Sequence, residues 1–128
     1  MRLLLDTHAL LWWLAGDTRL SRPAIDAIDA PGSQVLVSAV SVFEIATKHR
    51  LGKLPLPPVV AADIAGCLED HGFDALPLDA RVAERAGRLP GPSRDPFDRL
   101  LVAQAMLADL VLVSNEAAFD GYGIRRLW

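Results

Sequence analysis

The clearest pattern along the chain is a set of short apolar runs that separate longer segments of mixed polarity. Runs of apolar and β-branched residues without alternating polar positions are typical of strands buried on both faces of a sheet. The first run, LLLD, ends on the carboxylate of Asp6. Strands are predicted at residues 3–6, 34–37 and 110–113, with weaker candidates at 73–76 and 124–128.

The segments between these runs carry helix signals at their ends, such as Ser21 before Arg22-Pro23, and Gly52 after a periodic stretch. Helices are predicted at 8–15, 21–30, 38–51 (capped by Ser38 or Ser41), 59–70, 79–88 and 96–108, with loops at 54–58 and 91–96. Alternating strands and helices predict one α/β domain over residues 1–128. Its sheet should be mostly parallel, twisted and flanked by helices.

Length and composition narrow the class of protein without deciding its function. The 128 residues suit one domain, and no apolar run approaches the roughly 20 residues that cross a bilayer. Asp6 and His8 interrupt the apolar N-terminal stretch, which argues against a secretory signal, and the single Cys67 excludes an internal disulfide. We therefore expect a cytoplasmic protein. The net charge of −3 does not by itself indicate a nucleic-acid partner.

Polar residues follow three of the predicted strands. Asp6 ends the first strand, Glu44 lies shortly beyond the second, and Ser114 and Glu116 follow the strand at 110–113. In open parallel sheets, ligands gather beyond the carboxyl ends of the strands. These side chains are therefore expected at one edge of the sheet.

Each of these acids also has a purely structural explanation. Asp6 can cap the helix that follows it, and Glu44 can pair with Lys48 one turn later. Glu116 can belong to the first turn of a short helix, where acids are favoured. Asp120, a little further on, competes with Glu116 as a fourth acid of a site.

The segment Asp95-Pro96-Phe97-Asp98 combines a helix start with a possible site. Asp at the cap, Pro at the first helical position and an acid at the third make a strong helix N-terminus. Two acids three positions apart also converge there, so capping and metal binding are compatible. Arg99 follows Asp95 by four residues, a spacing at which it can neutralise or orient the pair.

A cluster of carboxylates at one edge calls for a cation. Like charges a few ångström apart cost on the order of 1 kcal/mol per pair even in high dielectric, and a bound divalent ion removes that cost. Oxygen ligands without a Cys or His cluster favour Mg²⁺ or Mn²⁺ over zinc. His8, His49 and His71 are too scattered for a zinc site and are predicted to be surface or packing residues.

Four motifs together resemble the PIN-domain family, in particular the VapC-type toxins of bacterial toxin–antitoxin pairs. The motifs are LLLDTHALLWWL, VSAVSVFEIATKHRLGKL, RDPFDRLLVAQA and LVSNEAAFDGYGIRRLW, and the resemblance covers nearly the whole chain. It implies a PIN-like fold and cleavage of RNA by metal-assisted hydrolysis with Mg²⁺ or Mn²⁺.

Carried over by position, the resemblance makes Asp6 and Asp98 the principal metal ligands and Glu44 a third. Glu116 occupies a fourth acidic position that completes a second site, where many relatives have Asp. Asp95 is an extra acid beside Asp98. The predicted catalytic set is completed by Ser114, whose hydroxyl would hold the attacking water or a carboxylate.

The same resemblance implies a small VapB-like antitoxin that blocks the site, a homodimer, and an RNA substrate. Candidate phosphate contacts are Lys48, Arg50, Arg94 and Arg99. Trp12 and Trp13 would pack in the core or in an antitoxin groove rather than stack on bases.

Two alternatives remain open at this point. Asp6 could accept a phosphoryl group, although His8 stands where a phosphatase of the haloacid-dehalogenase type would have a second Asp. The chain could also be a binding module whose acids are structural.

Overall fold

The structure, a computed structural model, describes residues 1–91 and 93–128 and has a five-stranded parallel sheet at its centre. The strand order is β3-β2-β1-β4-β5, so the predicted parallel α/β sheet is confirmed. Pro92, in the predicted loop 91–96, lies outside the described residues. The strands are β1 (Arg2–Leu5), β2 (Gln34–Ser38), β3 (Asp74–Leu76), β4 (Val111–Val113) and β5 (Arg126–Leu127).

The helices follow the predicted segments with one difference. The predicted helix over 59–70 is two helices, because Asp63 adopts an extended backbone (φ −157°, ψ 84°) and its side chain accepts a hydrogen bond from the Gly66 N–H. No helix in the described part of the chain is long and apolar enough to cross a membrane. The helices are α1 (Thr7–Ala15), α2 (Arg22–Asp29), α3 (Ala39–Arg50), α4 (Pro58–Ala62), α5 (Ile64–Asp70), α6 (Ala80–Arg88), α7 (Pro96–Ala108) and the 3₁₀ helix η1 (Ala117–Tyr122).

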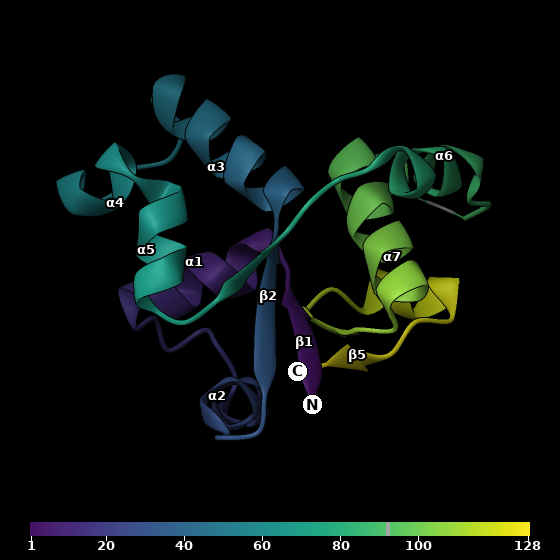
Figure 1. The fold of residues 1–128 in the computed structure, drawn as a ribbon, viewed down its shortest axis with the longest axis horizontal. Helices are drawn as coiled ribbons and strands as arrows, with labels where there is room; N and C mark the ends of the chain where they lie inside the picture. The colour runs from purple at the N-terminus through teal and green to yellow at the C-terminus, as the bar shows by residue number, and fades with distance from the viewer. Residues whose placement is uncertain (92) are drawn as a thin grey trace.

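Both faces of the sheet are covered, as the continuous apolar runs predict. Side chains along a strand alternate between faces, so Leu3 and Leu5 of β1 belong to one core and Leu4 to the other. The first core includes residues of α1, α2, α3 and α5, and the second includes residues of α7 and η1. In Figure 1, α5 and α7 lie on opposite sides of the two central strands.

The register of the strands sets the position of the polar residues that follow them. Leu5 at the end of β1 lies opposite Val37 of β2 and Val113 of β4. Asp6 and Ser114, the residues that follow β1 and β4, therefore leave the sheet at the same level, beside Ser38 at the end of β2. This carboxyl edge is the upper one in Figure 1, between α3 and α7.

Removing a buried side chain from the central strand, β1, should destabilise the whole domain. Leu4 is fully buried in β1, so Leu4→Ala is expected to lower the free energy of unfolding by about 2–5 kcal/mol, from lost transfer energy and the cavity that remains. Leu51→Ala is the control, because Leu51 is 51% exposed and should tolerate the change. Urea unfolding measures both variants, and equal losses would contradict this assignment of the core.

Candidate active site

Asp6 is the buried acid of the carboxyl edge. Its side chain is 5% exposed and accepts a hydrogen bond of 2.7 Å from the Ala9 N–H, which caps α1. Burial raises the pKa of Asp6, while hydrogen bonds from the Ser114 hydroxyl and the Ala9 N–H act in the opposite direction. The capping explanation is confirmed, and it leaves Asp6 at the edge where the sequence analysis placed it.

Glu44 is held by two side chains. The Thr7 hydroxyl donates to Glu44 Oε1 at 2.8 Å and also lies 3.0 Å from the Ser41 Oγ, while Lys48 Nζ lies 2.6 Å from Glu44 Oε2. The ion-pair explanation for Glu44 is therefore confirmed, and Lys48 is engaged at the edge. The bond from Thr7 was missed in the sequence, although the Asp-Thr pair at the end of the first strand was its available signal.

Asp95 and Asp98 share the first turn of α7 but differ in their surroundings. Asp95 is exposed and caps the helix by accepting a hydrogen bond of 2.9 Å from the Phe97 N–H. Asp98 is half-buried, and within the described residues its carboxylate has neither a hydrogen bond nor an ion pair. Burial first, and then the charges of four other acids, raise the pKa of Asp98 to about 6; in order of effect these are Asp95, Glu116, Asp6 and Glu44.

Arg99 does not neutralise the Asp95–Asp98 pair, so that prediction was wrong. Its guanidinium donates instead to three backbone carbonyls, Ala86 O at 3.1 Å, Ser93 O at 3.0 Å and Leu89 O. The carbonyls at the end of a helix lack intrahelical partners, and Arg99 supplies donors to them at the end of α6. This use of the side chain leaves the charge of Asp98 unopposed.

The segment after β4 carries two acids, Glu116 and Asp120, and only Glu116 is available to the site. Glu116 is exposed and makes no side-chain cap bond at the start of η1, while its N–H donates to the Ser114 Oγ at 3.1 Å. Asp120 forms two hydrogen bonds with Arg126, of 2.8 and 2.9 Å, and these lower the pKa of Asp120. Asp120 is therefore paired away from the site, which leaves Glu116 as the acid contributed by this segment.

Asp98 and the four acids whose charges affect it thus lie near one edge of the sheet, but they do not form a closed coordination shell. Among residues 1–91 and 93–128, no three His, Cys, Asp or Glu side chains converge closely enough to enclose a metal ion. The donors still fit a hard divalent cation, since they are carboxylate oxygens, and burial together with the charges of the other four raises the pKa of Asp98. A cleft of about 220 Å³ opens beside Asp98 and Glu116, and Ser93 and Tyr122 also line it.

The histidines take the packing and surface roles that were predicted. His8 is exposed, with its ring 5.7 Å from that of Trp12. His49 Nδ1 lies 2.9 Å from the Leu54 carbonyl oxygen, and His71 Nδ1 lies 2.9 Å from that of Cys67. The edge therefore has the chemistry of a carboxylate site.

The raised pKa of Asp98 predicts a pH-dependent effect of Asp98→Asn in metal-free protein. The folded-state value of about 6 exceeds the ordinary 3.8, so stability from this group is present at low pH and is lost as pH rises through 6. Asp98→Asn removes the repulsion and should raise the urea midpoint at about pH 7.5, with little effect near pH 4. Asp120→Asn, which loses the Arg126 partner, should not stabilise at either pH. An Asp98→Asn effect of equal size at both pH values would contradict the prediction.

Comparison with known proteins identifies the family of the chain. The family model described as the PIN domain matches residues 3–124. Ribonuclease VapC22 from Mycobacterium tuberculosis is 33% identical over 114 residues, which cover 88% of this chain and 85% of that protein.

Solved structures share the fold at low sequence identity. The structure of VapBC2 from Rickettsia felis, bound to a promoter DNA fragment, matches with a TM-score of 0.74 and 14% identity over 99% of this chain and 98% of that chain. A toxin–antitoxin complex from Klebsiella pneumoniae matches with a TM-score of 0.61 and 21% identity over 92% and 90% of the two chains. With the family model spanning nearly all of the sequence, the chain belongs to the PIN domain family.

Proposed function

We propose that the protein is the toxin of a type II toxin–antitoxin module and acts as a Mg²⁺- or Mn²⁺-dependent endoribonuclease. The observation that carries the proposal is the convergence of charge on Asp98 from the ends of two strands, from α3 and from its own helix. The 33% identity to a protein named as a ribonuclease supports RNA as the substrate. A domain spanning residues 1–128 is part of the same proposal.

The metal ligands in this proposal are the acids of the carboxyl edge. Asp6 and Asp98 would be the principal ligands, with Glu44 as the third, and Glu116 would complete a second site. A divalent ion held there supplies Lewis-acid chemistry, making water a better nucleophile and neutralising charge on the scissile phosphate. The chain contributes fixed oxygen donors on a rigid sheet edge.

The neighbouring residues have positioning roles. Ser114 is fully buried and bonds to Asp6, so we assign its hydroxyl to holding that carboxylate rather than the attacking water. Thr7 orients Glu44 in the same way. Asp95 starts α7 and adds negative charge beside Asp98, which strengthens the attraction for a cation.

A small antitoxin is the proposed protein partner. A cleft of about 440 Å³ lies between α1 and the proline-rich segment 53–57, and it reaches Thr7 and Lys48 at the edge of the acid site. Trp12 lines this cleft, with its ring 5.7 Å from that of Trp128 and with Arg19 over it at 5.0 Å. An antitoxin segment seated in the cleft would end beside Glu44 and block access to the acids. A homodimer located in the cytoplasm completes the proposal.

Removing the principal ligands should abolish cleavage without unfolding the protein. We expect Asp6→Asn and Asp98→Asn to slow Mg²⁺-dependent cleavage of total RNA by more than about 100-fold, since even outer partners of metal ligands are worth about 10–100-fold. Asp120→Asn is the control, because this acid lies in η1, after β4, and is paired with Arg126. Circular dichroism checks the fold. Wild-type protein, freed of any antitoxin, that leaves RNA intact with both Mg²⁺ and Mn²⁺ would overturn the proposal.

Metal binding can be measured separately from cleavage. Mg²⁺ or Mn²⁺ that binds only the folded state raises its stability with concentration, so the melting temperature of the wild type should rise with either ion. The rise should be lost in the Asp6→Asn/Asp98→Asn double variant and kept in Asp120→Asn. Equal shifts in all three proteins would place the bound ions elsewhere.

A further inference from the structure

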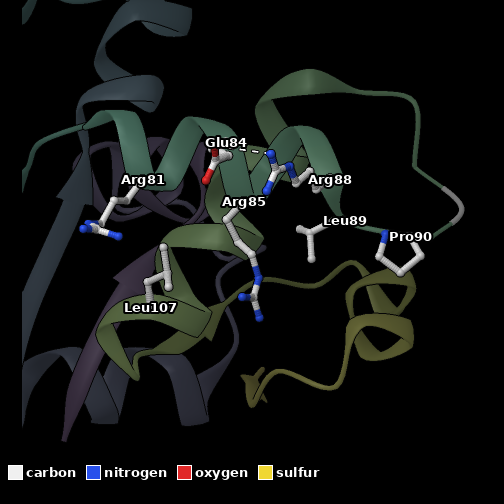
Figure 2. Close-up of a pocket in the computed structure, with 7 residues that line it drawn as sticks. All are labelled: Arg81, Glu84, Arg85, Arg88, Leu89, Pro90 and Leu107. Atoms are coloured by element: carbon white, nitrogen blue, oxygen red, sulfur yellow. Dashed lines mark ion pairs between the residues drawn. The ribbon is translucent and has the colours of Figure 1, made fainter.

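A row of arginines lies on α6, outside the acid site. Arg81, Arg85 and Arg88 are spaced by four and three positions, which places them on one face of the helix, and Glu84 is the acid among them. All four side chains are exposed and line a cleft of about 440 Å³. Its apolar part comes from Leu89, Pro90 and Leu107, and in Figure 2 Arg85 extends from α6 between Leu107 and Leu89.

The row runs toward the acid site. Helix α6 packs antiparallel to α7, because the Pro77 carbonyl before α6 accepts from Gln104, late in α7, whereas Ala86 and Leu89 accept from Arg99, early in α7. Arg99 directly follows Asp98 in sequence. The C-terminal end of α6, which carries Arg88, is therefore joined to the turn that holds Asp98.

Three of the cations near the acid site are already engaged. Lys48 binds Glu44, Arg126 binds Asp120, and Arg99 binds backbone carbonyls. Along α6, by contrast, Arg81 and Arg85 have no ion-pair partner among the described residues, and Arg88 meets Glu84 only at 3.5 Å on an exposed surface. Such a surface pair contributes little and is easily exchanged for another anion.

We propose that Arg81, Arg85 and Arg88 bind phosphates of the RNA strand on one side of the cleavage point. This inference rests on the proposed ribonuclease function. An edge with five acids repels a polyanion, so affinity has to come from cations outside it. Arg81 and Arg88 are separated by roughly 10 Å along the helix at about 1.5 Å per residue, close to three steps of a stacked strand at about 3.4 Å each. Arginine also matches phosphate with two parallel hydrogen bonds.

The surface favours a nucleic-acid backbone over the other occupants of such a face. Its apolar part offers no donors or acceptors to base edges, so contacts would follow phosphates and not sequence. A second copy of this face is disfavoured, because pairing by two-fold symmetry would set one arginine row against another. The row of arginines therefore supplies affinity for RNA and orients the bound strand, while other residues select the cleavage site.

The test measures RNA binding separately from cleavage. In an Asp98→Asn background, the affinity for a fluorescein-labelled single-stranded RNA is measured by anisotropy between about 0.05 and 0.2 M NaCl. Replacing all three arginines by Gln should lower the slope of log K against log salt by about 2, at about 0.7 per phosphate contact, and weaken binding at least tenfold. Arg88→Gln alone is compared with the control Arg22→Gln on α2. Both are exposed arginines that pair with an acid one helical turn away.

The outcomes separate this inference from the function on which it rests. A reduced salt slope with the triple variant supports the row even if the wild type cleaves no RNA, which would overturn only the proposed activity. In an active background, the triple variant should raise KM for long RNA with kcat nearly unchanged. An unaltered slope, or a loss of self-association in sedimentation in place of a loss of RNA binding, would overturn the assignment of the row to phosphates.

Discussion

The repulsion among carboxylates held at one edge of a parallel sheet is the constraint on which the rest of this structure depends. Strand register fixes Asp6 and the segment leading to Glu116 at the same level, and α7 begins with two further acids beside them. The backbone positions of these acids are therefore fixed by the sheet and by the start of α7. The cost is concentrated on Asp98, whose pKa of about 6 records both its burial and the four charges around it.

The scaffold moderates this repulsion unevenly. Asp6 receives hydrogen bonds from a backbone N–H and a hydroxyl, and Glu44 receives one from Thr7 and a charge from Lys48. The cation nearest to Asp98 in sequence, Arg99, is used to tie α6 to α7. A site in which every carboxylate had a partner would be more stable but would bind a divalent ion less tightly. Lower stability in exchange for function is common at functional sites.

Much of the fold could be predicted from the sequence because its signals are local. Continuous apolar runs gave the strands, and Ser21, Ser38 and Asp79 cap helices as their side-chain chemistry requires. The break at Asp63 was missed because no Gly or Pro marks it. The acids of the site could be predicted as a group, since each follows an element whose end is visible in sequence. The orientation of Arg99 and the pairing of Asp120 with Arg126 could not, because both depend on which distant backbone or side chain folds into reach.

The hydrogen bonds also distinguish the acids by how many of their oxygens are already engaged, which sequence spacing cannot do. Both oxygens of Glu44 are engaged, one by Thr7 and one by Lys48, so direct coordination would have to displace Lys48 or share a lone pair. Asp6 is anchored by its cap, whereas the carboxylate of Asp98 is unengaged within the described residues. Asp98 and Asp6 would therefore be the acids most available to hold a divalent ion. Glu44 would hold such an ion through water, or directly only if its bond to Lys48 were broken.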